Sequence, residues 1–400
     1  MKIILMRNLD YWIGIPLCFI LSGINLFLKL FGIKAKKNTK PNNILFIKPS
    51  EIGSIILSCP LIQRVKEEHK DSRLFFLTFQ SNKDLLKVLA IIPAENIIEI
   101  NDKSFFGFII DTVKAVSRMH KENIDTTIDL EFFSRFTSII SYLSGASRRV
   151  GFYKYSFEGL YKGTLLTHRI QYNPQIHISS QFLSFSQPLN CSNKISPDLQ
   201  LTPDISKYIL PIFNANAEQT ANILNKLSKF KVENDSMLFL INPGEGLIPQ
   251  RDWPLKNYIS VIKRLLENAK NIVVIVGASR SGLRTNEICS EVKSNRIINL
   301  CGETTIEELL TLFTIGETLI VSDSGLAHLA SLTKIKQFVM FGPETPSVFS
   351  PLSKNAHIFY SKLPCSPCLS AFNHRKSCCT NNECLKTIDP KAVIEEIEKS

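Results

Sequence analysis

Motifs that mark several common enzyme classes are missing from this sequence of 400 residues. No Gly-x-Gly-x-x-Gly follows any segment predicted as a strand, which argues against a nicotinamide-dependent dehydrogenase. The Gly-x-Ser-x-Gly turn that exposes a nucleophilic serine is also absent, which disfavours a Ser-His-Asp hydrolase. No internal repeat of short period is visible. Apolar residues make up 44% of the chain, so sizeable cores are expected. The length suggests two or three domains.

More than half of the net positive charge lies in the first 40 residues. Residues 1–40 hold seven Lys or Arg and one Asp, a net charge of +6, so the other 360 residues carry only +5 of the total of +11. A basic body would indicate nucleic-acid binding, and we therefore expect no nucleic-acid partner. A basic end beside an apolar segment instead indicates an anionic membrane surface.

The apolar segment is Tyr11–Phe31, and a membrane-spanning helix needs about 20 such residues. Pro16, Asn25 and Lys29 interrupt it, and no small-residue cleavage site precedes the basic run. Three interpretations stay open: a membrane anchor that spans the bilayer or lies in its interface, a buried helix of the body, and a signal peptide. The lysines after the segment place the body on the cytoplasmic face of the inner membrane by the positive-inside bias.

Two regions of the chain alternate apolar runs with segments of helical spacing, which is typical of parallel sheets covered by helices. Residues 155–235 between them are less regular, with helix expected inside 207–231. Strands are expected at 43–48, 73–79, 96–100, 126–130 and 149–152 in the first region, and at 236–242, 271–276, 297–300, 318–321 and 338–341 in the second.

The turn after the first strand reads KPSEIGS and runs from Lys48 through Ser50 to Ser54. Gly53 permits close backbone approach, and the helix that follows favours a negative ligand at its N-terminus. Glu51 could accept a proton from an attacking hydroxyl within hydrogen-bond reach. Alternatively, Glu51 is a helix-start residue favoured by the helix dipole.

A second loop, INPGEGLIPQRDWPL, follows the strand at 236–242. Gly244 and Gly246 free backbone amides to face a ligand. Arg251 precedes Trp253-Pro254, where the proline suits the first turn of a helix. A fixed guanidinium beside exposed amides fits a diphosphate, although an ordinary surface arginine is the alternative.

A third loop, VSDSGLAH, follows the strand at 318–321. Asp323 would lie at the carboxyl edge of the sheet, where open α/β sheets bind ligands. Ser324 and Gly325 would begin a helix and offer amides and a hydroxyl to a phosphate. His328 falls one turn further on, beside Ser324. The alternatives are that Asp323 caps the helix and that His328 is a core residue.

Three segments together resemble glycosyltransferase family 9, the lipopolysaccharide heptosyltransferases. They are residues 44–66, 241–258 and 297–346, and the last is the most diagnostic, with Asp-Ser-Gly-x-x-His and Phe-Gly-Pro-x-x-Pro. The resemblance covers about residues 43–395 and is weakest over 155–235. It implies a GT-B fold, in which two Rossmann-like domains face each other across a cleft. It also implies inverting, metal-independent transfer from a nucleotide-sugar donor.

Carried over to this sequence, the resemblance assigns the donor to the second region. Arg251 stands where the family commonly has a lysine, and either residue would offset diphosphate charge. The other donor-binding candidates are Asp323 for the sugar, Ser324, Gly325 and Leu326 for the diphosphate, with His328 nearby, Gly244 in the preceding loop, and Gly277, which closes the strand toward the nucleoside.

One departure concerns the base. Family members usually carry an Asp directly after the glycine of the first loop, and here that position is Ser54. A serine hydroxyl is no base at pH 7 without help. Glu51 is the nearest replacement on the same loop. Otherwise the base lies elsewhere, or the protein is a non-catalytic nucleotide-sugar-binding or assembly protein.

Five of the ten cysteines gather in residues 364–384. Four of them could form a structural four-thiolate zinc site, and free thiols in a local structural knot are the alternative. The zinc set would be Cys365, Cys368, Cys379 and Cys384, with His374 as a further ligand.

The sequence therefore predicts an α/β protein of the GT-B type that needs no cofactor for transfer. We expect heptose transfer from ADP-heptose to a lipopolysaccharide-core or related glycolipid. The expected parts are a membrane-anchor segment and linker at 1–42, an acceptor domain at 43–232, a donor domain with the Cys-rich tail at 233–388, and a helix at 389–400 that packs back toward the first domain.

Overall fold

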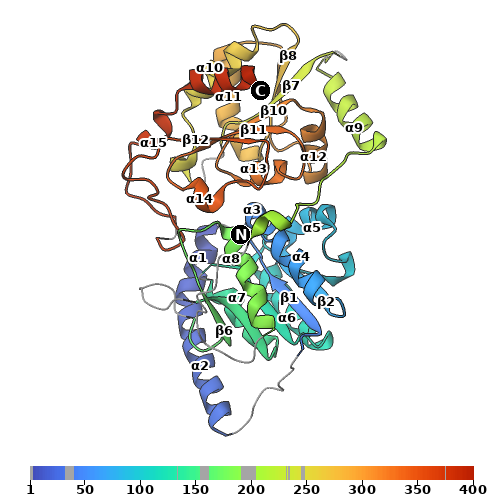
Figure 1. The fold of residues 1–400 in the computed structure, drawn as a ribbon, viewed down its shortest axis with the longest axis vertical. Helices are drawn as coiled ribbons and strands as arrows, with labels where there is room; N and C mark the ends of the chain where they lie inside the picture. Colours follow the sequence, from blue (N-terminus) through green and yellow to red (C-terminus); the bar gives the residue numbers. More distant parts are fainter. Residues whose placement is uncertain are drawn as a thin grey trace. The chain divides into compact units, whose positions relative to one another are not determined.

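The computed structural model describes residues 3–31, 40–132, 134–153, 162–190, 204–230, 232, 235–244, 248–373 and 375–400. The chain forms two compact units, Met1–Ile209 and Leu210–Ser400. Each unit contains one six-stranded sheet with helices around it (Figure 1). The expected α/β class is therefore confirmed, and each predicted strand is present.

The sheet of the first unit is parallel throughout, in the order β3-β2-β1-β4-β5-β6. The last strand was not predicted, because its four residues, HRIQ, contain no apolar run. The strands are β1 (Asn43–Ile47), β2 (Arg73–Phe79), β3 (Ile97–Ile100), β4 (Thr126–Asp129), β5 (Arg148–Tyr153) and β6 (His168–Gln171).

The helix expected after β1 is broken in two, as Pro60 indicated. Ser58 separates the two parts, and Pro60 lies in the first turn of the second, where its missing N–H costs no hydrogen bond. The helices of this unit are α1 (Ile3–Trp12), α2 (Gly14–Leu30), α3 (Ile52–Leu57), α4 (Cys59–Glu68), α5 (Lys83–Leu89), α6 (Phe105–Lys121), α7 (Arg135–Leu143) and α8 (Ile178–Leu183).

The N-terminal segment lies against the first unit through an unusual face. The residues of α2 that are buried are Gly14, Cys18, Ser22 and Asn25, all of them small or polar. The Asn25 amide donates to the Thr164 carbonyl at 3.1 Å and to its hydroxyl at 2.9 Å. In the described part of the chain, no single helix is long and apolar enough to cross a membrane. Met6–Trp12 and Gly14–Leu30, bent by 41°, meet that criterion only as a pair.

The second unit repeats the topology of the first, with the parallel order β12-β11-β10-β7-β8-β9. In both sheets the strand order reverses beside the first strand, between β1 and β4 and between β7 and β10. Such switch points open crevices at the carboxyl ends of the strands. The strands are β7 (Met237–Asn242), β8 (Asn271–Ile275), β9 (Ile297–Asn299), β10 (Thr318–Ser322), β11 (Lys336–Phe341) and β12 (Ala356–Tyr360).

One helix of the second unit begins at a hydrogen-bonded cap that neighbouring residues form. Thr305 and Glu308 form a capping box, in which each side chain is bonded to the other's backbone amide. The helices are α9 (Ala217–Ser228), α10 (Leu255–Leu265), α11 (Gly282–Val292), α12 (Ile306–Ile315), α13 (Gly325–Ala330), α14 (Pro346–Phe349), α15 (Glu383–Lys386) and α16 (Pro390–Lys399).

Two helices belong to the second unit although the sequence suggested the first. The expected boundary at residue 232 put α9 in the first domain, but α9 contacts α12, and Lys226 pairs with Glu308 at 3.0 Å. The division falls at residue 209 instead. The final helix, α16, packs on α10 and places Val393 in the core of the second unit.

Candidate functional site

The loop after β1 is held by a carboxylate that sequence reasoning missed. Glu131 follows β4, the neighbour of β1 in the sheet. Its Oε2 accepts from the Lys48 ammonium at 2.9 Å. Its Oε1 accepts from the Ser50 amide at 3.1 Å and the Ser50 hydroxyl at 2.7 Å. The Lys48 side chain is fully buried, so this ion pair fixes the loop on the sheet. The signal for Glu131 was its place directly after a predicted strand.

Glu131 is in turn positioned by Asp129, the last residue of β4. The Glu131 amide donates to Asp129 Oδ1 at 3.1 Å, and the Ser138 hydroxyl donates to Asp129 Oδ2 at 3.0 Å. Burial raises the pKa of the Asp129 carboxyl, while Lys162, 3.6 Å away, acts in the opposite direction.

Glu51 and Ser54 lie together at the start of α3. Glu51 Oε2 accepts from the Ser54 hydroxyl at 2.9 Å and lies 3.9 Å from the Lys48 ammonium. The Glu51 side chain is 35% exposed and does not cap the helix, so the helix-start alternative does not account for it. Gly53 is buried in the first turn of α3.

The backbone of Glu51 is strained. Its φ is +67° and its ψ is +96°, values that a residue with a side chain rarely adopts. Strain of this kind costs about 1–3 kcal/mol and gathers at functional sites. The turn therefore holds the Glu51 carboxylate against Ser54 at an energetic cost.

Replacing Glu131 with Ala is expected to lower the free energy of unfolding by about 3 kcal/mol, because the buried Lys48 charge loses its main partner. Urea denaturation followed by circular dichroism measures the change. Asp71→Ala is the control. It breaks an exposed ion pair between Asp71 and Lys40, 3.0 Å apart, and should shift the transition little. Equal shifts in both variants would contradict the role of Glu131.

In the second unit, hydrogen bonds hold the loop after β7 in place on both sides of Arg251. Trp253 is fully buried, its amide donates to the Ser322 hydroxyl at 3.1 Å, and its indole N–H donates to the Ile388 carbonyl at 3.2 Å. Arg284 donates to the Pro243 and Trp253 carbonyls at 2.7 Å and 3.0 Å. The centre of the loop, residues 245–247 with the predicted Gly246, lies outside the described residues.

Arg251 belongs to a cluster of four charges beyond the carboxyl ends of β7, β10 and β11. Its guanidinium pairs with Asp323 at 3.3 Å and with Glu344. Glu344 Oε1 also forms an ion pair with Arg375, at 3.1 Å from Arg375 Nε. Burial raises the pKa of the Glu344 carboxyl, while Arg375 and Arg251 act in the opposite direction. Glu344 and Arg375 were not predicted. Glu344 lies in the Phe-Gly-Pro-x-x-Pro motif after β11, whereas no sequence signal marks Arg375.

Four buried polar atoms at this cluster have no hydrogen-bond partner among the described residues: the donors Arg251 Nε and Ser324 Oγ, and the carboxylate oxygens Asp323 Oδ2 and Glu344 Oε1. The two carboxylate oxygens lie in ion pairs with Arg251 and Arg375. Buried polar groups are normally bonded, so the two orphaned donors call for an explanation. Asp323 does not cap α13, because Ser324 is the N-cap residue and forms no side-chain cap bond. Asp323 instead faces Arg251. The structure thus brings together Arg251, Asp323 and Ser324 as the sequence predicted.

The remaining predicted residues follow the carboxyl ends of β7, β8 and β10. Gly325 and Leu326 begin α13, and His328 is buried in it, as the core alternative also required. Gly277 follows β8 with a φ of +151°, and a Cβ there would lie 2.6 Å from the side-chain nitrogen of Asn242. Gly244 has a φ of +96° and no room for a side chain beside Asp252. Only glycine suits these two positions.

The predicted zinc site stays a prediction. Within the described ranges, no group of three or more His, Cys, Asp or Glu side chains is arranged to hold a metal ion. Cys365 is exposed and Cys384 is buried. Burial raises the pKa of Cys384 to about 11, and Cys368, Cys365 and Cys379 act in the same direction. His374 lies outside the described residues.

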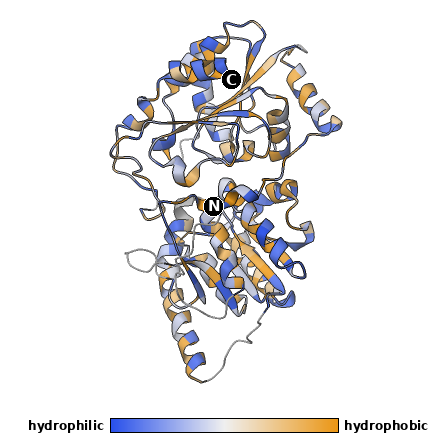
Figure 2. Ribbon diagram, in the orientation of Figure 1, coloured by the Kyte–Doolittle hydropathy of each residue, from blue (hydrophilic) through white to orange (hydrophobic). Residues whose placement is uncertain are grey.

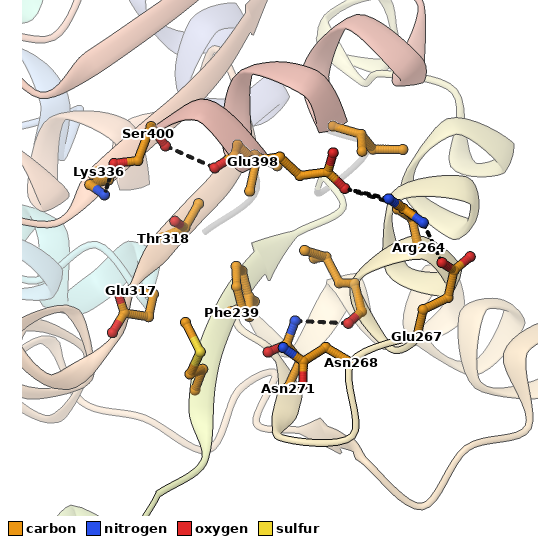
Figure 3. Close-up of a pocket in the computed structure, with 14 residues that line it drawn as sticks. Phe239, Arg264, Glu267, Asn268, Asn271, Glu317, Thr318, Lys336, Glu398 and Ser400 are labelled. Atoms are coloured by element: carbon orange, nitrogen blue, oxygen red, sulfur yellow. Dashed lines mark hydrogen bonds and ion pairs between the residues drawn. The ribbon is translucent and has the colours of Figure 1, made fainter.

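A cavity of about 580 Å³ in the second unit lies elsewhere (Figure 3). Its walls include Met237, Asn271, Thr318 and Lys336, the first residues of their strands, so it opens at the amino ends of the sheet. Ligands of open α/β sheets bind at the carboxyl ends. This cavity is therefore not the donor site.

The family model of glycosyltransferase family 9 (heptosyltransferase) matches residues 115–378, more than half of the chain. The chain belongs to glycosyltransferase family 9. The matched range of the family model includes Arg251, Asp323, Ser324 and Glu344, so the orphaned atoms described above lie inside the family region.

Among similar family 9 proteins is lipooligosaccharide heptosyltransferase 2 of Campylobacter jejuni serotype O:2, with 23% identity over 87% of this chain and 95% of that protein. The enzyme of the same name from serotype O:6 is 28% identical over 42% of this chain. That match spans 52% of the relative, about half its length. Lipopolysaccharide heptosyltransferase 2 of Salmonella typhimurium is 28% identical over 33% of this chain and 38% of its own.

Solved structures of the family share the fold. The family 9 protein of Veillonella parvula superposes with a TM-score of 0.71 at 15% identity, covering 92% of this chain and 99% of that chain. Escherichia coli ADP-heptose lipopolysaccharide heptosyltransferase II gives a TM-score of 0.67 at 17% identity, over 89% and 98%.

Proposed function

We propose that this family 9 protein is an inverting, metal-independent glycosyltransferase of the GT-B type. It moves heptose from ADP-heptose to a lipopolysaccharide-core or related glycolipid. Family membership and the relatives named lipooligosaccharide or lipopolysaccharide heptosyltransferase support the reaction class. The donor is supported by E. coli heptosyltransferase WaaC, of similar fold, whose structures contain ADP and ADP-2-deoxy-2-fluoro heptose.

The observation that carries the donor site is the pair of orphaned donors, Arg251 Nε and Ser324 Oγ, beside Asp323. A diphosphate oxygen would satisfy both donors, and Asp323 would accept hydroxyl protons of the sugar. With only six residues, α13 contributes a modest dipole, so Arg251 supplies most of the charge that stabilises the leaving ADP.

On the acceptor side, Glu51 is the proposed base. A glycolipid hydroxyl attacks C1 of the donor sugar, the bond from C1 to the diphosphate oxygen breaks, and the configuration at C1 inverts. Glu51 takes the hydroxyl proton and ADP leaves with the bonding electrons. The support is the 2.9 Å hydrogen bond between Glu51 and Ser54, because the carboxylate lies beside the position where family members usually carry their acid. The Lys48 ammonium forms an ion pair with Glu51 at 3.9 Å.

The location that fits this acceptor is the cytoplasmic face of the inner membrane. The pair α1 and α2 exposes apolar residues, and the sequence beyond α2 is basic. We propose that this N-terminal segment associates with the membrane and keeps the first unit near its glycolipid.

The test is incubation of the purified protein with ADP-heptose and a heptose-deficient lipopolysaccharide core, followed by mass spectrometry of the glycolipid. We expect addition of one heptose, undiminished by EDTA. Donor binding by calorimetry with no transfer and no hydrolysis over a panel of acceptors would replace this proposal with the non-catalytic binding protein.

A further inference from the structure

The outer face of α2 is apolar while its inner face is small and polar, and the end of α1 also exposes apolar residues. A helix on a water-exposed surface has the reverse arrangement. Hydrophobic residues continue along α2 to its end (Figure 2). The side chains exposed by more than a third are Tyr11, Trp12, Ile13, Leu17, Phe19, Ile20, Ile24, Leu26, Phe27, Leu30 and Phe31.

A second helix of the first unit, α6, also presents an apolar stripe to solvent. Its inner face places Ala115 and Met119 in the core. Its outer face exposes Phe106 by 78% and Val113 by 65%. Residues spaced by four along a helix share one face. The full outer stripe is Phe105, Phe106, Ile109, Ile110 and Val113.

The two apolar faces belong to one layer of helices. Helices α6 and α7 pack on the same face of the sheet, and the Phe108 and Phe136 rings lie 4.9 Å apart. Helix α2 packs on α7 through Cys18 and Ile139. Asp10 of α1 accepts from the Phe136 amide at 2.8 Å. Helix α7 therefore connects the two exposed apolar faces.

We propose that this helix layer docks the first unit on an anionic lipid bilayer, with α2 lying in the interface and α6 as a second contact. The proposal extends the membrane location given above to α6, and it does not depend on sugar transfer. An apolar surface of this extent needs a partner. Bulky apolar and aromatic side chains on one helix face are typical of interfacial helices.

Charge identifies the partner as anionic lipid. The exposed charged residues of α1 and α2 are Arg7 and Lys29, both positive. The acidic residue, Asp10, faces inward and lies 3.6 Å from the Arg135 guanidinium. Trp12 and Tyr11 are the residue types that favour the headgroup region.

The contacts of the inner face of α2 determine how this helix is oriented on the first unit. Gly14 packs against Arg135, and the Thr164 amide donates to the Ser22 hydroxyl at 3.0 Å. Asn25 bonds to Thr164 near the end of the helix. The helix thus stays on the protein along most of its length and cannot be surrounded by lipid. It lies in the plane of the interface.

The experiment measures co-sedimentation of the full chain with vesicles. One set contains phosphatidylethanolamine and phosphatidylglycerol, and the other contains phosphatidylcholine alone. The double variant Phe106→Ser/Ile110→Ser should bind the anionic vesicles at least about tenfold more weakly than wild type. The control is Leu283→Ser on α11, because Leu283 is 83% exposed but lies in the second unit. It should bind like wild type.

The double variant Phe19→Ser/Phe27→Ser should also lose binding, and phosphatidylcholine vesicles should capture little protein. Wild-type binding by the α6 variant would overturn the second contact while leaving the N-terminal proposal in place. Equal binding to both vesicle types would overturn the anionic preference. Loss of a dimer in gel filtration, with vesicle binding unchanged, would assign the surface to a second copy of the chain. Transfer to a deacylated, water-soluble acceptor should be unchanged in the α6 variant, which separates this test from that of the proposed function.

Discussion

Glu51→Gln is expected to reduce kcat by about 10²–10⁴-fold, the range that a general base contributes. The amide keeps the size of the side chain and its hydrogen bond with Ser54 but cannot take the acceptor proton. The affinity for ADP should stay unchanged, because the donor residues lie in the second unit. Steady-state transfer with ADP-heptose and calorimetry with ADP measure the two effects.

A rescue variant sharpens this test. Ser54 lies 2.9 Å from the Glu51 carboxylate, so Ser54→Asp in the Glu51→Gln background returns an acid to nearly the same place. We expect the double variant to transfer sugar at least about tenfold faster than Glu51→Gln alone. Glu67→Gln, a substitution of an exposed glutamate on α4, is the matched control and should transfer at the wild-type rate. Full activity of Glu51→Gln would show that the base lies elsewhere.

Arg251→Ala is expected to lower kcat/KM by about 10²–10³-fold, because the charge that stabilises the departing diphosphate is lost. Arg251→Lys keeps a point charge without the guanidinium fork, so an intermediate loss is expected. Glu344 retains Arg375 as a partner in both variants, which favours folding. Transfer kinetics and ADP calorimetry measure the effects.

The control for Arg251 is Arg264→Ala, which removes an exposed arginine of the same unit that pairs with Glu398 at 2.9 Å. It should leave donor affinity and rate unchanged. If Arg251→Ala bound ADP as tightly as wild type, the diphosphate would have to lie away from the orphaned atoms of this cluster.

Local patterns were enough for the framework of the molecule. The apolar runs that became β1 and β10 are read from five or six neighbouring residues, and so is the capping box at Thr305 and Glu308. The loops that hold Glu51, Arg251 and Asp323 were found because each follows such a run. The short polar strand β6 was missed because it carries no such pattern.

The side chains that pair with residues of these loops could be identified only from the fold. Glu131 is 83 residues from Lys48, and Glu344 is 93 residues from Arg251. No periodicity links residues at such separations, and only the parallel sheet brings the ends of these strands to one edge. The same holds for the cysteines, whose spacing suggests a zinc site although the described side chains are not arranged to hold a metal ion.

The N-terminal segment shows most clearly which properties the sequence determines and which the fold determines. Its sequence alone determined that it is apolar, helical and followed by basic residues, because those are properties of adjacent positions. Which face meets the protein was decided by the fold, since Ser22 and Asn25 are hydrogen-bonded to Thr164, about 140 residues away. Burying polar groups requires partners, and those partners turned the apolar face outward.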